Sequence, residues 1–264
     1  MSWLNIENKV VIVTGASSGI GEAIAKELCN LGAFVVNADI NEGAFTHSNY
    51  FFVQTNVALR ESVKQMVDFT IDKFGRVDAL VNNAGVNVPA LLSDKRNVSD
   101  YELTDDLFDK MTMINQKGVY LASQLVSKIM LKQHSGVIIN MSSEAGLEGS
   151  EGQSCYAATK AAVNSFTRSW SKELGKEGIR VVGIAPGIME ETGLRTLAYE
   201  TALAYTRGKT VEAIREGYSQ TATIPLGRSG KLSEVADTVA YLISDKASYI
   251  SGVTLNVAGG KTRG

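Results

Sequence analysis

Short runs of residues that are apolar at nearly every position alternate along this chain with longer stretches of helical periodicity. Apolar runs of this kind indicate strands that are buried on both faces of a sheet. Strands separated by helices imply right-handed crossovers, so that the strands lie parallel and helices cover both faces. We therefore expect an α/β fold with a doubly wound parallel sheet of about seven strands.

The expected elements follow from these patterns. Strands are expected at 9–14, 34–39, 51–57, 77–82, 137–141, 180–185 and 253–257, and helices at 19–31, 60–74, 105–133, 154–176 and 233–244. Gly178 is the expected stop of the fourth helix. The connections 86–104 and 188–223 are long, and long connections commonly carry function. Both follow carboxyl ends of strands, where ligands bind in such sheets. We expect 1–264 to form one dinucleotide-binding and catalytic domain, in which 188–223 covers the substrate.

Composition excludes several classes of protein. A chain of 264 residues can bury one large core, and a net charge of −2 argues against nucleic-acid binding. No stretch approaches the apolar length of a membrane span, and the N-terminus does not read as a signal peptide. The two cysteines fit a reducing cytoplasm. His47 and His134 form no ligand-spaced cluster, so no metal is expected.

A glycine-rich turn follows the first expected strand. Gly15, Gly19 and Gly21 permit a tight turn and a close approach of backbone to a pyrophosphate at the helix N-terminus. An ordinary strand-to-helix turn is the alternative, and the position after the first strand favours a nucleotide in a Rossmann-type domain. Asp39 ends the second strand, where a carboxylate accepts hydrogen bonds from ribose hydroxyls and repels a 2′-phosphate. NAD is therefore expected rather than NADP.

Tyr156 and Lys160 stand four residues apart in an expected helix, with Ser143 thirteen residues earlier. Residues at this spacing project from one helix face. A tyrosine with a pKa near ~10 is a poor base at neutral pH, and an adjacent ammonium favours the phenolate. A solvated Tyr/Lys pair is the alternative, but it does not explain the serine and the cofactor turn. The set predicts hydride transfer between a nicotinamide and an alcohol.

Together, these motifs resemble the short-chain dehydrogenase/reductase family. The resemblance comprises TGASSGIG at 14–21, NNAG at 82–85, Asn115, Ser143, YAATK at 156–160 and PG at 186–187. It implies that Tyr156 is the catalytic acid/base and that Lys160 lowers the pKa of Tyr156 and binds the nicotinamide ribose. It also implies that Ser143 polarises the substrate oxygen and that Asn115 holds a water linking Lys160 to solvent.

The resemblance also implies a set of cofactor contacts. They are Gly15, Ser17, Ser18, Gly19, Ile20, Gly21, Asp39, Asn56, Val57, Asn83, Ala84, Gly85, Tyr156, Lys160, Pro186, Gly187 and Ile188. Asn56 replaces an aspartate common in the family. The path from Gly187 to Thr192 is longer than usual, so Ile188 is preferred to Thr192 as a contact. A homotetramer built through 105–133 and 154–176 is a further implication.

Stretches 143–156, 187–195 and 258–264 carry a closer likeness to family members that act on hexitol phosphates. It implies reversible oxidation of D-sorbitol 6-phosphate at C2 to D-fructose 6-phosphate, with Ser143, Tyr156, Glu144 and Arg195 meeting the substrate. Glu190 and Glu191 are expected to point away from the phosphate or to bind hydroxyls. The candidate phosphate ligands are Lys95, Arg96, Arg195, Arg207, Lys209 and the tail 261–263, which could reach a neighbouring subunit. Alternatives are a dehydrogenase of an unphosphorylated polyol and a non-catalytic NAD-sensing protein.

Overall fold

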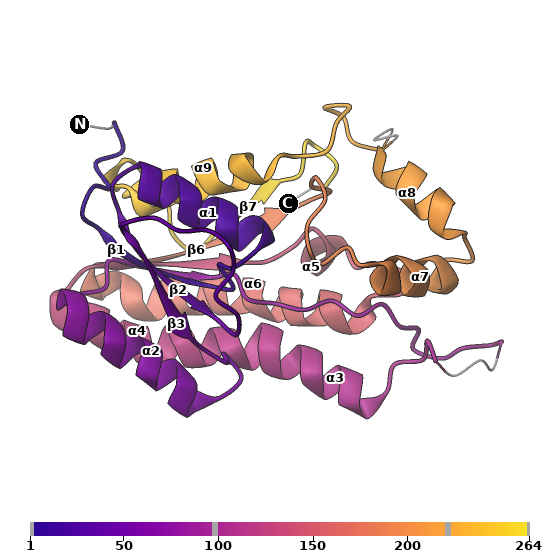
Figure 1. Cartoon of the computed structure of the whole chain (residues 1–264), viewed down its shortest axis with the longest axis horizontal. Helices are drawn as coiled ribbons and strands as arrows, with labels where there is room; N and C mark the ends of the chain where they lie inside the picture. The colour runs from indigo at the N-terminus through magenta and orange to yellow at the C-terminus, as the bar shows by residue number, and fades with distance from the viewer. Residues whose placement is uncertain (1–2, 97–99, 220–222, 263–264) are drawn as a thin grey trace.

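Seven parallel strands form the centre of the structure, a computed structural model that describes residues 3–96, 100–219 and 223–262 (Figure 1). Their spatial order is β3-β2-β1-β4-β5-β6-β7, which confirms the predicted doubly wound, Rossmann-type sheet. The order reverses between β1 and β4, so a crevice opens at the carboxyl ends of these strands. The strands are β1 (Val10–Thr14), β2 (Phe34–Asp39), β3 (Tyr50–Gln54), β4 (Ala79–Asn82), β5 (Gly136–Met141), β6 (Ile179–Pro186) and β7 (Thr254–Val257).

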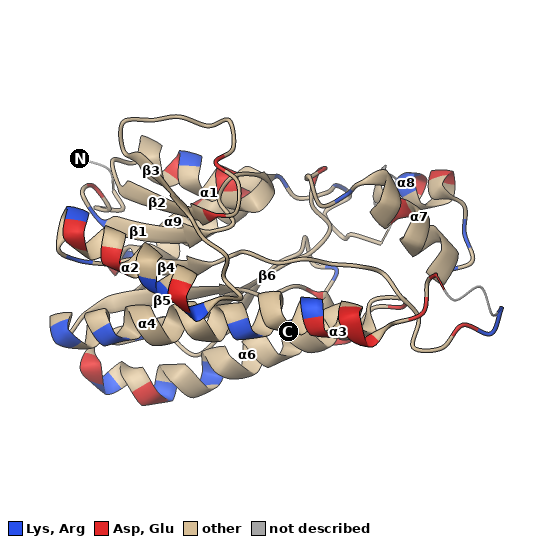
Figure 2. Cartoon of the chain, turned by 60° about the horizontal axis from the view of Figure 1, so that its bottom comes forward, with Lys and Arg blue, Asp and Glu red and all other residues tan. Residues whose placement is uncertain are grey.

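Side chains of the strands alternate between two apolar cores, one on each face of the sheet. Val11 and Val13 of β1 belong to one core, and Ile12 between them belongs to the other. This division follows from the two-residue period of a strand. The three central strands, β1, β4 and β5, carry no charged residue, and Figure 2 shows the charges on helices and loops instead. The uncharged runs seen in the sequence are thus the centre of the sheet.

Helices cover both faces of the sheet (Figure 1). The first face holds α1 (Gly19–Asn30) and α9 (Leu232–Ile243), and the second holds α2 (Arg60–Phe74), α4 (Gly118–Gln133) and α6 (Ser154–Leu174). The short turns are η2 (Gly175–Glu177), η3 (Asp245–Ala247) and α5 (Ala145–Glu148). Gly178 has a φ of 77° and ends the turn after α6, as predicted. None of the described helices is long and apolar enough to cross a membrane.

The helix predicted over 105–133 is present as three consecutive pieces. They are α3 (Asp105–Thr112), a π-helical turn η1 (Met113–Lys117) and α4. A π turn carries one extra residue and commonly marks a functional position. Here it contains the fully buried Asn115. The sequence predicted the length of this helix but not its interruption.

Segment 188–223, predicted as a long connection, contains two helices, and that prediction was wrong in this respect. They are α7 (Leu197–Thr206) and α8 (Val211–Ser219), which lie beyond the carboxyl edge of the sheet (Figure 1). The Thr196 Oγ1 accepts a hydrogen bond from the Tyr199 N–H at 3.2 Å, and this cap starts α7. The Thr210 Oγ1 accepts a hydrogen bond from the Ala213 N–H at 3.1 Å, and this contact caps the start of α8 in the same way. These caps are the signal in the sequence that could have revealed both helices.

Candidate active site

A cavity of about 360 Å³ lies along the carboxyl ends of β1, β2 and β4, where the dinucleotide was predicted. Most of the predicted cofactor residues line it: Gly15, Ser18, Gly19, Ile20, Gly21, Asp39, Asn56, Val57, Asn83, Ala84, Gly85, Tyr156, Lys160 and Pro186. Gly187 and Ile188 instead line a second, adjoining cavity, and Ser17 lines neither of the two. Thr192, which the sequence ranked below Ile188, lines both.

The glycine-rich turn allows a close approach of backbone. Gly15 and Gly19 have φ values of 67° and 57°, which glycine adopts without strain. A Cβ on Gly21 would lie 2.1 Å from the carbonyl oxygen of Gly15, so a side chain is excluded there. Ser18 at the start of α1 makes no side-chain cap, which leaves the first N–H groups of the helix available to an anion. This arrangement fits a pyrophosphate.

Asp39 lies at the end of β2 with both carboxylate oxygens engaged by backbone. Its Oδ2 accepts a hydrogen bond from the Ser17 N–H at 3.1 Å, and its Oδ1 accepts one from the Asn41 N–H at 3.3 Å. The Ser17 hydroxyl donates to the Asn41 carbonyl oxygen and accepts from Asn37 Nδ2, at 2.8 Å for the latter contact. Both hydrogen bonds of the Ser17 hydroxyl are therefore made within the protein, and Ser17 does not line the cavity. Asp39 does line the cavity, and its carboxylate fits a ribose diol.

Two more predicted contacts serve the loops around this cavity. Asn83 donates through Nδ2 to the carbonyl oxygens of Thr14 and Gly15, at 3.0 Å each, and so ties β4 to the glycine turn. Asn56 accepts from the Ala58 N–H at 3.0 Å, which closes a local turn. Amides therefore fix the floor of the cavity.

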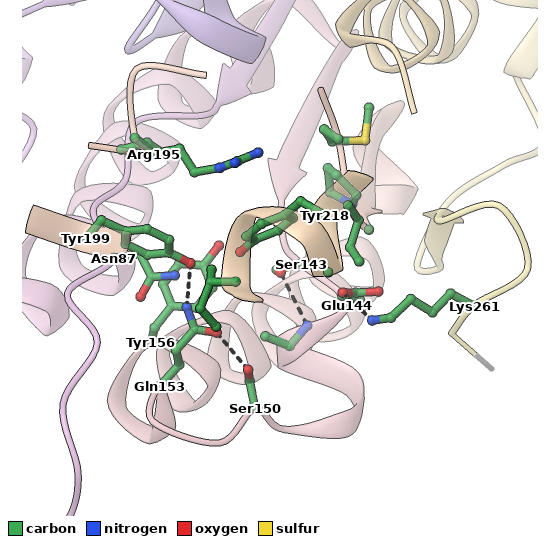
Figure 3. A pocket seen from close by; sticks show the side chains of 18 of the residues that line it. Asn87, Ser143, Glu144, Ser150, Gln153, Tyr156, Arg195, Tyr199, Tyr218 and Lys261 are labelled. Carbon is green, nitrogen blue, oxygen red and sulfur yellow. Dashed lines mark hydrogen bonds and ion pairs between the residues drawn. The ribbon is translucent and has the colours of Figure 1, made fainter. Parts of the chain in front are cut away.

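Tyr156 lies where the two cavities meet. The second cavity, of about 480 Å³, shares six lining residues with the first: Ile20, Ser142, Tyr156, Pro186, Thr192 and Leu194. Its walls come from the β5–α6 loop and from the segment that carries α7 and α8, and Figure 3 shows Tyr156 and Ser143 within it. A molecule in each cavity would meet at this tyrosine.

Burial dominates the electrostatics of the predicted catalytic pair. It lowers the pKa of Lys160 to about 8, and the Nζ of Lys160 donates to the carbonyl oxygen of Met141 at 2.7 Å. The pKa of Tyr156 is raised above its ordinary value, first by burial and further by the charge of Glu144, while a hydrogen bond with Ser143 lowers it. The direction is opposite to the sequence prediction. The ammonium lies 5.7 Å from the centroid of the tyrosine ring and does not outweigh burial.

Asn115 connects the π turn to the loop after β4. Its Oδ1 accepts from the Val86 N–H and its Nδ2 donates to the Val86 carbonyl oxygen, both at 2.8 Å. A Cβ placed on Gly85 would lie 3.3 Å from Asn115 Oδ1 and 3.6 Å from Lys160 Nζ. The absence of a side chain at Gly85 keeps open the space between the amide and the ammonium.

Glu144 is held by the C-terminal tail of its own chain, the segment that the sequence offered as a further candidate phosphate ligand. Lys261 Nζ lies 2.6 Å from Glu144 Oε1 (Figure 3). Thr262 Oγ1 donates to Glu144 Oε2 at 2.9 Å. Glu144 follows Ser143 directly, so the tail fixes the cavity wall beside the predicted catalytic serine. Arg263, the other tail candidate, lies outside the described residues.

Arg195 lines the second cavity but is already paired with a carboxylate. Its guanidinium lies 3.1 Å from Glu200 Oε1 and stacks 4.2 Å over the ring of Tyr218. Lys95 and Arg96 do not line this cavity, and Arg96 stacks 3.6 Å over Tyr205 instead.

Glu190 and Glu191, which were expected to point away from a phosphate or to bind hydroxyls, differ in whether they line the cavity. Glu190 lines the cavity, and its Oε1 accepts from the Leu232 N–H at 2.7 Å. Glu191 does not line it.

Comparison with known proteins identifies the family to which this site belongs. The sequence pattern described as short chain dehydrogenase matches residues 9–202. This chain belongs to that family. The match begins at β1 and includes the glycine turn, Asn115, Ser143, Tyr156 and Lys160.

Whole-chain relatives agree with this assignment. A sorbitol-6-phosphate 2-dehydrogenase from Klebsiella pneumoniae is 61% identical over 266 residues, covering 100% of this chain and 99% of that protein. A 3-oxoacyl-[acyl-carrier-protein] reductase from Thermotoga maritima is 36% identical over 97% of this chain and 99% of that protein.

Solved structures of similar fold include enzymes with different substrates. The 3-ketoacyl-(acyl-carrier-protein) reductase from Brucella melitensis, complexed with NADH, matches with a TM-score of 0.82 and 28% identity over 98% of this chain and 100% of that one. The aldohexose dehydrogenase from Thermoplasma acidophilum matches with a TM-score of 0.84 and 28% identity over 98% and 96% of the two chains.

Several polar residues of this short-chain dehydrogenase were missed by the sequence reasoning. Tyr199 accepts a hydrogen bond from Gln153 Nε2 at 2.8 Å, and the Ser150 hydroxyl donates to Gln153 Oε1 at 2.7 Å, in series along the cavity wall (Figure 3). Tyr199 belongs to α7, which was not predicted, and this explains the omission. Within the described residues, no group of three acidic, histidine or cysteine side chains could hold a metal ion.

Proposed function

We propose that this short-chain dehydrogenase uses NAD to oxidise D-sorbitol 6-phosphate at C2 to D-fructose 6-phosphate, reversibly. The observation that carries the proposal is the position of Tyr156 at the junction of two cavities. Ser143 is hydrogen-bonded to Tyr156, and the Lys160 ammonium lies 5.7 Å from the centroid of its ring. The whole-chain identity of 61% to a sorbitol-6-phosphate 2-dehydrogenase supports this substrate.

NAD, when bound, supplies the nicotinamide C4 that accepts a hydride. The glycine turn and the open N-terminus of α1 would hold its pyrophosphate, and Asp39 would bind the adenosine ribose. Asn56 and Val57 would lie by the adenine, and Asn83, Ala84 and Gly85 by the ribose above β4. Lys160 would bind the nicotinamide ribose. Pro186, Gly187, Ile188 and Thr192 would surround the nicotinamide end.

The chain's own residues would then move the proton. Ser143 orients the C2 hydroxyl toward Tyr156, and the Tyr156 phenolate takes the hydroxyl proton as the C2–H bond breaks. Lys160 stabilises the phenolate by its charge, and Asn115 holds a water that passes the proton toward solvent. Glu144 binds substrate hydroxyls, and segment 188–223 covers the substrate within the single domain.

The proposed assembly is a homotetramer in the cytoplasm. Exposed Phe108 on α3 and Tyr120 on α4 support a contact through 105–133. Cys29 and Cys155 are free and buried, which suits a reducing compartment. Light scattering tests the mass in solution.

NAD reduction with hexitol phosphates and the matching free alcohols tests the proposed reaction. We expect the fastest turnover with D-sorbitol 6-phosphate. Tyr156→Phe should abolish NADH formation while NAD still binds, measured by calorimetry, because the phenyl ring keeps the cavity but lacks the proton-accepting oxygen. Equal turnover of sorbitol and its phosphate would favour an unphosphorylated polyol instead. NAD binding without turnover of any alcohol would favour an NAD sensor.

A further inference from the structure

Four cationic side chains line the substrate-side cavity, and two of them are neutralised. Arg195 is paired with Glu200 and Lys261 with Glu144, as described above. The other two are Arg207 and Lys209. Among the described residues, neither makes an ion pair with a carboxylate.

A short turn after α7 holds these two cations together. The Arg207 N–H bonds to the Leu203 carbonyl oxygen at 3.1 Å, and the Lys209 N–H bonds to that of Ala204 at 2.9 Å. Gly208 between them has a φ of 60°, so the chain reverses there and both neighbours stay at the end of α7. Backbone hydrogen bonds therefore fix the positions from which the two cationic side chains start.

Arg207 also contacts the loop before α6. One terminal nitrogen donates to the Ser150 hydroxyl at 3.1 Å, and Nε donates to the Glu151 carbonyl oxygen at 3.4 Å. A guanidinium has five N–H donors, so several stay available to an anion. Ser150 is hydrogen-bonded to Gln153, which precedes the first turn of α6 and lies one helical turn before Tyr156.

This series of hydrogen bonds runs from the cationic turn through Ser150 to Gln153, one helical turn before the reacting tyrosine. From Tyr156 the wall runs through Gln153 and Ser150 to Arg207, offering an amide, a hydroxyl and then a charge. A polyol with one hydroxyl at Tyr156 and a dianion at its far carbon has the same order of groups. Of the carboxylates on the wall, Glu144 and Glu190 are held by other donors, and Glu148 lies on α5.

We propose that Arg207 and Lys209, with the hydroxyl of Ser150, form the subsite for the substrate phosphate. The proposal rests on the proposed function and assigns its phosphate specificity to the turn after α7. Arginine offers a planar fork to phosphate oxygens, and lysine adds a point charge at the cavity mouth. Arg195, the cation favoured from the sequence, instead stabilises α7 and α8 through Glu200, which also pairs with Arg215 at 2.7 Å.

The test compares Arg207→Gln, Lys209→Gln and the double variant with the wild-type enzyme. Steady-state kinetics at saturating NAD are measured with D-sorbitol 6-phosphate and with D-sorbitol. Removing either cation should raise KM for the phosphorylated substrate by roughly tenfold to a hundredfold, since a charge-assisted hydrogen bond to the phosphate disappears, with kcat/KM for sorbitol unchanged. Lys95→Gln, an exposed lysine outside the cavity, is the matched control and should change neither value.

Inhibition by inorganic phosphate gives a second readout that does not depend on turnover of sorbitol. The wild-type enzyme should be inhibited competitively against sorbitol 6-phosphate, and the double variant should lose this inhibition. If the wild-type enzyme prefers the phosphorylated substrate and the double variant keeps that preference, the subsite is wrong and the proposed function stands. If the wild-type enzyme shows no preference, the phosphate part of the proposed function fails, and the subsite fails with it.

Discussion

Replacing Lys160 by methionine should abolish turnover and yet remove an energetic cost from the folded state. The ammonium is buried, and burial lowers its pKa from 10.5 to about 8. At about 1.4 kcal/mol per pKa unit, this difference corresponds to roughly 3 kcal/mol needed to keep the charge inside the fold at neutral pH. Methionine fills a similar volume without a charge.

The sign of the pH dependence follows from the lowered pKa. Below the folded pKa of about 8, both states of the protein hold the proton and the full cost is present. Between that value and the unfolded pKa of 10.5, the unfolded chain binds more protons, so stability rises with pH. From about pH 7 to about pH 9.5, the wild-type enzyme should gain roughly 2 kcal/mol relative to Lys160→Met.

Urea unfolding at a fixed protomer concentration measures this difference at each pH. The methionine variant also lacks the hydrogen bond from Lys160 to the Met141 carbonyl oxygen. This loss shifts the difference in unfolding free energy by a constant amount. It does not change the slope of that difference with pH, provided that Lys160 stays in place when it loses its proton. Lys172→Met, at an exposed position on the same helix, is the control and should show no such slope. A stability difference that stays flat across this range would refute the idea that Lys160 is a buried, costly charge.

Three further predictions concern the cofactor turn and the tail. Gly21→Ala should abolish NAD binding in calorimetry, since its methyl group would lie 2.1 Å from the Gly15 carbonyl oxygen; an unchanged Kd would contradict this. Asp39→Ala should raise KM for NAD roughly tenfold or more, through loss of charge-assisted bonds to the ribose, and narrow the preference over NADP in parallel assays. Lys261→Met should shift the pH profile of alcohol oxidation to higher pH, because the charge of an unpaired Glu144 raises the pKa of the catalytic tyrosine further. Lys261→Arg should restore the profile, and identical profiles in both variants would count against the pairing.

Most of the fold was predictable because the burial of an element determines which of its positions are apolar. The strands at the centre of the sheet are buried on both faces, so almost every residue in them is apolar, as in Val10–Thr14. The π turn in the helix over 105–133 has no such pattern. Its buried Asn115 hydrogen-bonds to Val86, and a tertiary contact of this kind leaves no periodic pattern in the sequence.

The positions of the proposed catalytic and cofactor residues around the cavities were predictable, and their electrostatics were not. Motif spacing places Tyr156, Lys160 and Ser143 together, yet the depth of burial decides the direction of each pKa. The sequence also does not show which cationic side chains of the cavity are paired with carboxylates. Arg195 and Arg207 look equivalent in the sequence, and only the folded chain shows that Glu200 neutralises the first.

Opposed charges around Tyr156 explain why the tail belongs to the site. With its raised pKa, Tyr156 is protonated at neutral pH, which is the state needed to donate a proton to a ketone. Oxidation of an alcohol needs the phenolate, which the Lys160 ammonium, 5.7 Å from the ring centroid, favours. Glu144 adds a negative charge nearby and works against the phenolate. A carboxylate beside this base is compatible with phenolate formation only if its charge is balanced, and Lys261 provides that balance from the C-terminal tail.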